Sequence, residues 1–215
     1  MTDGDYTDDA LRFPEAKRFT RDLAIDIVRD HACNLWSPSR DALRCDWMEL
    51  AGHHAPTLTL LVGRGALAHG ARFVGVDTDV ATIDGCRAHF GSDAPAVWVN
   101  GTVETVLTRR EHADTVARVG VLVYDSHDGV HARPDRVRRT LRPLFDFARR
   151  QHDALGEFLL VLNLASDPRF TRPEHQTEYA QVLSEGLGAS VSVDDIHRYT
   201  SKATLMSWVA LRYGF

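Results

Sequence analysis

Two carboxylates stand at the ends of apolar segments near the middle of the chain. Glu49 follows the apolar residues of the segment WMEL, and Asp77 closes the segment FVGVD. Because the carboxyl ends of parallel strands meet at one edge of an open sheet, we expect both side chains to line the same crevice. Backbone N–H groups and a carboxylate in such a crevice can bind a ribose. The pattern therefore predicts a site for a ribose-bearing ligand.

The segments around these carboxylates alternate between strand-like and helical patterns. Strand-like segments end at Leu50 and cover 72–77, 96–100, 119–125 and 157–165, and helical segments cover 80–90, 102–115, 134–151 and 173–187. Strands that alternate with helices over this length imply right-handed crossovers and a mainly parallel sheet.

Both ends of the chain depart from this alternation. Residues 1–12 are acidic and polar, which predicts a flexible terminus, and residues 13–44 form an N-terminal helical segment. In that segment we expect a helix from about Glu15 to His31 and a short second helix that begins at Ser37 and Pro38. Near the C-terminus, two strand-like segments, 189–199 and 204–213, are separated by about four residues, which predicts an antiparallel hairpin.

The predicted fold is therefore α/β, with a Rossmann-like, doubly wound, seven-stranded sheet that is mainly parallel and ends in an antiparallel hairpin. The net charge of −5 and the charged content of 26% give no global attraction for nucleic acid or anionic membrane. The three widely spaced cysteines, Cys33, Cys45 and Cys86, indicate reduced thiols rather than a disulfide or zinc framework. Because the N-terminus does not resemble a signal peptide, we expect a cytoplasmic protein.

Residues 40 to 215 resemble the class I S-adenosylmethionine-dependent methyltransferases, whose seven-stranded sheet carries its last strand reversed. In GVDTD, which resembles the motif after the second strand of the family, Asp77 would bind the ribose hydroxyls and Thr78 would lie beside it. In MELAG, which resembles the start of the first motif, Glu49 and Gly52 would lie near the methionine part of the cofactor. The resemblance makes residues 45–215 a methyltransferase-like α/β domain.

The first motif departs from the family pattern after Gly52. His53, His54, Ala55 and Pro56 stand where the family has further glycines. Glycines allow a positive φ and a close approach of the backbone to a ligand, whereas proline has no N–H to donate. Two readings follow: an altered turn that still binds the cofactor, or a site that has lost it. The spacing from Gly52 to Asp77 fits a turn, helix and strand, which favours the altered turn.

Two further segments resemble motifs of the family. In VWVNGT, the resemblance places Asn100, Gly101 and Thr102 at the adenine. In LVYDSHDG, the resemblance implies that four residues face the methyl acceptor: Tyr124, Asp125, Ser126 and His127. This second segment is neither the DPPY motif of amino-methylating nucleic-acid enzymes nor a Pro-Cys pair, so the acceptor stays open between a small molecule and nucleic acid.

Several of these side chains have alternative roles. Asp125 is interpreted as a general base, a ligand for a hard cation, or a carboxylate that lines the cofactor pocket. His127 and His131 have the spacing of a helical metal pair, but Gly129 and the following Arg-Pro favour a loop, so no metal site is predicted. Four arginines of the helical segment 134–151 form a basic face that is either solvated or in contact with phosphates: Arg136, Arg138, Arg139 and Arg142.

The sequence therefore predicts methyl transfer from S-adenosylmethionine, with Asp125, Ser126 and His127 at the acceptor. A nicotinamide-dependent oxidoreductase would need a GxGxxG turn, which the sequence lacks after the first strand. A catalytically inactive, methyltransferase-like scaffold that binds a partner stays as the alternative, because the glycine-rich turn is degenerate and a fold alone does not settle function.

Overall fold

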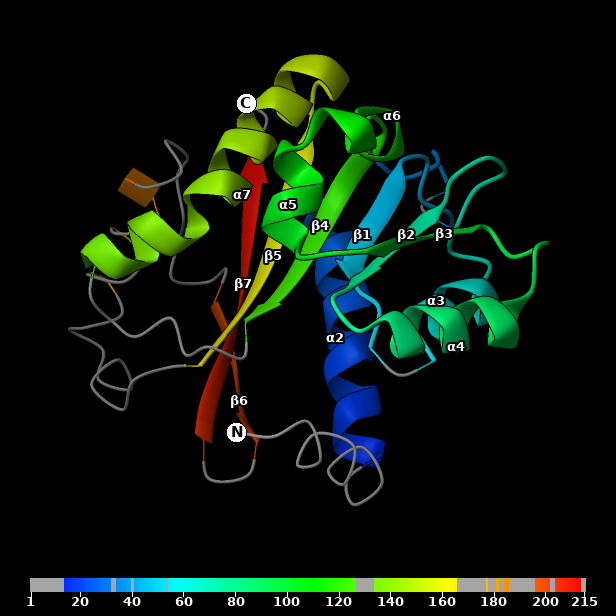
Figure 1. Cartoon of the computed structure of the whole chain (residues 1–215). Helices are drawn as coiled ribbons and strands as arrows, with labels where there is room; N and C mark the ends of the chain where they lie inside the picture. The colour runs from blue at the N-terminus through cyan, green and yellow to red at the C-terminus, as the bar shows by residue number, and fades with distance from the viewer. Residues whose placement is uncertain are drawn as a thin grey trace.

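A central sheet with helices on both faces forms the body of the protein, as Figure 1 shows. The structure is a computed structural model that describes residues 14–31, 34–39, 41–52, 54–126, 134–165, 177, 181, 184–185, 196–201 and 204–213. The predicted α/β class and the mainly parallel, Rossmann-like sheet are confirmed in these residues.

The strands are β1 (Asp46–Leu50), β2 (Phe73–Asp77), β3 (Ala96–Asn100), β4 (Val119–Ser126), β5 (Phe158–Ala165), β6 (Ile196–Ser201) and β7 (Thr204–Tyr213). The helices are α2 (Pro14–His31), α3 (Pro56–Gly63), α4 (Val80–Phe90), α5 (Val103–Thr108), the 3₁₀ turn η1 (Arg110–His112), α6 (Ala113–Val116) and α7 (Pro134–Leu155). Strand and helix bounds from Phe73 to Asn100 agree with the sequence patterns to within one residue.

The strand order in the sheet is β3-β2-β1-β4-β5-β7-β6. The five strands from β3 to β5 are parallel, whereas β7 is antiparallel to both β5 and β6. The chain runs outward from β1 to β3 and then returns to β4 on the other side of β1. This reversal creates a switch point between β1 and β4, where ligands bind at the carboxyl ends of the strands in open α/β sheets.

Alternate residues of each strand enter two separate cores, because successive side chains of a strand point to opposite faces. Helices α5, α6 and α7 cover one face, where Met48, Leu122 and Leu160 are fully buried. Helices α2, α3 and α4 cover the other face around Trp47 and Phe73. Burial of one such large side chain contributes about 1.5–3 kcal/mol, so these two cores fix the strand ends that carry the predicted site.

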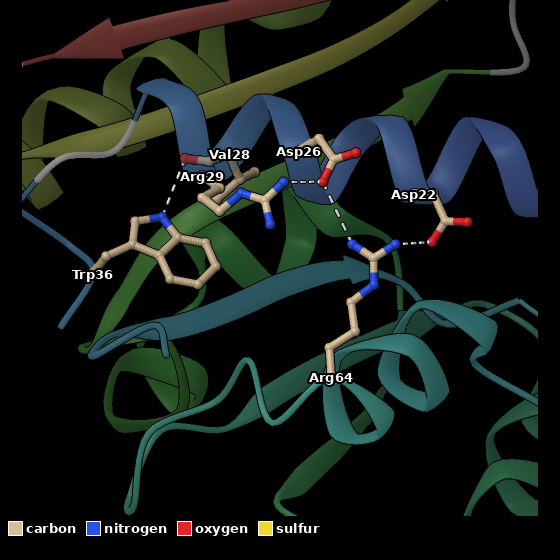
Figure 2. A network of polar contacts seen from close by, with 6 residues as sticks. All are labelled: Asp22, Asp26, Val28, Arg29, Trp36 and Arg64. Carbon is tan, nitrogen blue, oxygen red and sulfur yellow. Dashed lines mark hydrogen bonds and ion pairs between the residues drawn. The ribbon is translucent and has the colours of Figure 1, made fainter. Parts of the chain in front are cut away.

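Helix α2 packs its buried face on the core and also makes polar contacts with the segments beside it, as Figure 2 shows. Arg64, which follows α3, pairs with Asp22 and Asp26 on α2. The indole N–H of Trp36 donates a hydrogen bond to the carbonyl of Val28, 3.2 Å away. Since exposed ion pairs contribute about 0–1 kcal/mol each, the burial of the apolar face of α2 dominates this attachment.

The expected short helix at Ser37 and Pro38 is wrong. The Ser37 hydroxyl accepts the N–H groups of Asp41 and Ala42, and the Ser37 N–H donates to the Ala42 carbonyl at 2.7 Å. These bonds close a loop, and Trp36 forms an antiparallel bridge with Leu43 at its base. The serine therefore stabilises a reversal of the chain by hydrogen bonds instead of capping a helix.

The segment predicted to be helical over 102–115 is helical in the structure, but it is divided into α5, η1 and α6. Arg109 adopts extended dihedral angles, with φ −83° and ψ 136°, which end α5. The expected helix over 173–187 lies outside the described residues except at four positions.

Candidate functional site

The turn between β1 and α3 has an unusual backbone. Gly52, His54 and Ala55 have φ values of 55°, 61° and 38°, so two non-glycine residues adopt the left-handed region. This region costs an L-residue about 1–2 kcal/mol. The turn thus keeps backbone angles that glycine favours, although only its first residue is a glycine.

Pro56 has a simple role at the end of this turn. It is the first residue of α3, where the backbone N–H would have no partner within the helix, so the missing donor costs nothing. The Ala55 N–H donates to the Gly52 carbonyl at 3.4 Å. A Cβ atom added to Gly52 would meet no atom of the described residues within 4 Å, so these residues leave open space beside the turn.

Glu49 ties β1 to the first turn of α3. One carboxylate oxygen accepts the hydroxyl of the buried Thr57 at 2.9 Å, and the other accepts the indole N–H of Trp47 at 2.9 Å. Both bonds fix the carboxylate at the carboxyl end of β1, next to the turn. Glu49 therefore has a structural role in holding strand and helix together.

The two acids of the GVDTD segment have different surroundings. Asp79 caps α4: its carboxylate accepts the hydroxyl of Thr82 and the N–H groups of Ala81 and Thr82, and these bonds lower its pKa. Asp77 is half-buried, and its Oδ1 accepts the Asp79 N–H at 2.9 Å. Its Oδ2 accepts no hydrogen bond from any residue that the structure describes. Of the two acids, only Asp79 has both carboxylate oxygens hydrogen-bonded to described residues.

The residues after β3 lie beside Asp77, since Asn100 pairs with Asp77 in the sheet register. The side-chain amide of Asn100 donates to the carbonyls of Asp77 and Thr78, at 3.1 and 3.0 Å. The Gly101 N–H donates to the Asp77 carbonyl at 2.9 Å, and the Thr102 hydroxyl caps α5. Asn100 and Thr102 therefore both have structural roles at this edge.

The acceptor-facing residues are only partly described. Asp125 and Ser126 end β4, but their side chains and the whole of His127 lie outside the described residues. The Tyr124 hydroxyl, at the same end of β4, donates to the Glu104 carboxylate on α5 at 2.8 Å. Sequence reasoning did not include Glu104, whose only local signal is its place in the first turn of a helix.

The predicted basic face on α7 is described only in part. Arg142 is exposed and lies 3.7 Å from Asp146, one turn further along the helix. The side chains of Arg136, Arg138 and Arg139 lie outside the described residues. The phosphate-binding interpretation of this face therefore stays a prediction.

The described residues contain no group of three or more histidine, cysteine or acidic side chains placed to bind a metal ion. His54 contacts another histidine, since its ring centroid lies 4.9 Å from that of His89 on α4. In the same described part of the chain, no helix has the length and apolar content needed to cross a bilayer.

One acceptor and the turn at these strand ends fit the adenosyl cofactor that the resemblance implies. A ribose needs a hydrogen-bond acceptor for its hydroxyls, and Oδ2 of Asp77 is one. A close approach of backbone needs a turn free of side-chain bulk, and the described residues leave the space next to Gly52 open.

No model of a protein family matches the sequence, and no curated protein matches it. Among solved structures, the chain is similar to yhhF of Escherichia coli, a protein named as a methyltransferase, with a TM-score of 0.50 and 10% identity over 91% of this chain and 85% of that chain. It is also similar to the N-methyltransferase NodS of Bradyrhizobium japonicum, with a TM-score of 0.49 and 12% identity over 92% of this chain and 98% of that chain. The first similarity shows a shared fold: this chain has the same Rossmann-like α/β fold as that protein.

Proposed function

We propose that this chain is a methyltransferase that uses S-adenosylmethionine. The observation that carries the proposal is the combination of two features at neighbouring strand ends. One is the left-handed turn after β1, with open space at Gly52. The other is Asp77, whose Oδ2 has no partner in the described part of the chain. Together they would supply a backbone segment that can approach the cofactor closely and an acceptor for its ribose hydroxyls. Both lie beside the switch point between β1 and β4.

Each residue at this edge receives a role in binding. Asp77 would accept the ribose hydroxyls with Thr78 beside it, Gly52 would face the methionine part of the cofactor, and Glu49 would keep the turn in place. The segment 100–102 would border the adenine. When bound, S-adenosylmethionine supplies an electrophilic methyl group, so the work of the protein is to bind and orient an acceptor.

The acceptor would meet the carboxyl end of β4, where the sequence places Asp125, Ser126 and His127. One of these groups is needed as a base only if the attacking atom must lose a proton. A small molecule and a nucleic acid both remain open as acceptors. A nucleic acid would also use the arginines of α7, and its retention on the protein would then fall steeply between low and high salt.

Calorimetry with S-adenosylmethionine and S-adenosylhomocysteine tests the proposal. We expect wild type to bind both, and Asp77→Asn to bind at least tenfold more weakly, because a hydrogen bond to a charged group contributes about 1.5–3 kcal/mol. Asp114→Asn is the matched control, since Asp114 is exposed on α6, which precedes β4 and lies at the opposite edge of the sheet.

The outcome for wild type separates the two candidate functions. If wild type releases no heat and shows no thermal shift with either ligand, the methyltransferase proposal fails and the scaffold alternative replaces it. If wild type binds and Asp77→Asn binds equally well, the cofactor site is elsewhere.

A further inference from the structure

Cys86 lies on the inner face of α4, directly against the left-handed turn. Its side chain is fully buried, and its sulfur is 3.6 Å from the carbonyl oxygen of Gly52. The backbone N–H groups of His54 and Ala55 lie close enough to the thiol to lower its pKa, although burial outweighs them. One side chain thus contacts Gly52, a residue of the turn with positive φ, and lies near the backbone of the other two, His54 and Ala55.

The protonation state of Cys86 suits this role. Burial raises the pKa of the Cys86 thiol, and the negative charge of Asp77 raises it further. The thiol therefore keeps its proton at neutral pH and can donate it to the Gly52 carbonyl.

A second contact from α4 reaches the same turn. His89 lies three residues after Cys86, so both side chains project from one side of the helix. The ring of His89 packs against the ring of His54, one of the two strained residues. A left-handed conformation at a non-glycine residue persists only where surrounding contacts enforce it, and α4 supplies such contacts to the turn at Gly52 and His54.

We propose that Cys86 is a positioning residue that holds Gly52, His54 and Ala55, the described residues of the turn, in the shape that binds the cofactor. The inference rests on the proposed function, because it assigns the turn to the same ligand. In this chain, contacts from a neighbouring helix replace the glycines that would otherwise allow the turn. Cys86 itself touches neither the cofactor nor the acceptor.

The first test compares cofactor affinity among cysteine variants by calorimetry with S-adenosylhomocysteine. We expect Cys86→Ala to bind roughly tenfold more weakly, because the turn loses the contacts that enforce its shape. Cys86→Ser keeps a donor and an acceptor, so we expect it to stay within about threefold of wild type. Cys45→Ala is the matched control: Cys45 is also buried, but it precedes β1 at the other edge of the sheet.

The second test needs no variant and therefore does not depend on how well Cys86→Ala folds. Thiol labelling of wild type, followed by peptide mass spectrometry, reports how often each buried cysteine becomes accessible. We expect saturating S-adenosylhomocysteine to slow the labelling of Cys86 at least fivefold and to slow that of Cys45 much less. Stabilisation of the whole protein would instead slow both cysteines equally.

The outcomes distinguish this inference from the proposed function. If wild type binds no cofactor, the proposed function fails and the inference fails with it. If wild type binds, and Cys86→Ala binds as tightly while both cysteines are protected equally, only the positioning role of Cys86 is overturned.

Discussion

An aspartate and a buried cysteine lie at the amino ends of the parallel strands, here called the amino edge. Another aspartate and another buried cysteine lie at the carboxyl ends, the carboxyl edge, in different surroundings. At the amino edge, Asp46 is fully buried, and both of its oxygens accept hydrogen bonds from Arg72, including one from Nη2 at 2.7 Å. At the carboxyl edge, Asp77 is half-buried and has one oxygen without a partner in the described residues. An aspartate whose two oxygens both accept hydrogen bonds within the protein has a structural role. An aspartate with an oxygen that accepts no such bond is suited to bind a ligand.

The two buried cysteines repeat this contrast. Cys45 packs so closely on Gly120 that a Cβ there would lie 2.5 Å from its sulfur, and burial raises the pKa of its thiol to about 12. The Cys86 thiol instead donates a hydrogen bond to the carbonyl of Gly52, in a strained turn beside which the described residues leave open space. The amino edge is therefore closed by packing, and the carboxyl edge is held in shape while space remains beside it.

The largest expected effect is on stability at the amino edge. Asp46→Ala should lower the free energy of unfolding by about 3 kcal/mol, because it removes one partner of a charge pair whose carboxylate is fully buried. Asp77→Asn should change it by less than about 0.5 kcal/mol, as for most substitutions outside the core. Urea unfolding of both variants checks the contrast, and equal losses would contradict it.

Overpacking gives the next effect in size. Gly120→Ala should cost about 2 kcal/mol, because the new methyl group would collide with the sulfur and Cβ of Cys45. The double variant Gly120→Ala/Cys45→Ala removes the sulfur and should recover part of the loss, which a double-mutant cycle measures. A cycle with no coupling would show that the two residues do not share this space.

Strain at the carboxyl edge gives a change of opposite sign. His54→Gly should raise the free energy of unfolding by about 1 kcal/mol, because glycine adopts a φ of 61° without the penalty that histidine carries. The exposed Thr59, inside α3, is the control: Thr59→Gly should destabilise, since glycine costs energy in a helix interior. If both variants lose stability in thermal unfolding, the turn is not strained at His54.

Much of the fold could be predicted from the sequence because apolar runs and their spacing are local signals. The strand 96–100 and the helix 80–90 were predicted with the bounds that the structure has. The loop at Ser37 was missed, because its bonds to Asp41 and Ala42 form only when the chain reverses. A serine followed by proline is equally compatible with a helix start, so the local pattern could not decide.

The candidate site was predictable only where it follows from strand ends. Asp77 and Asn100 meet because neighbouring parallel strands bring their carboxyl ends together. The left-handed turn was not predictable, because histidine and alanine carry no local signal for positive φ. The role of Cys86 depends on α4 packing against that turn, which is a tertiary contact.

The smallest expected effect is at Asp79, the N-cap of α4. It makes the stability of the carboxyl edge depend on pH. The pKa of Asp79 lies below its ordinary value of 3.8, since the hydroxyl of Thr82 and nearby N–H groups bind the charged form. A depressed folded-state pKa means that the contribution of Asp79 to stability is complete above about pH 4 and is lost as the pH falls through the folded value. Cys86 lies on α4 and contacts the turn. We therefore expect weakening of this cap at low pH to make the turn less ordered as well.

Asp79→Asn separates the charge from the cap. Asparagine is as good an N-cap as aspartate but does not titrate, so this variant should unfold at nearly the wild-type temperature at pH 7. Between pH 4 and pH 3, wild type should lose more thermal stability than Asp79→Asn, and amide exchange should quicken first at Ala81 and Thr82. Parallel losses in the two proteins over that interval would mean that the cap does not respond to acid.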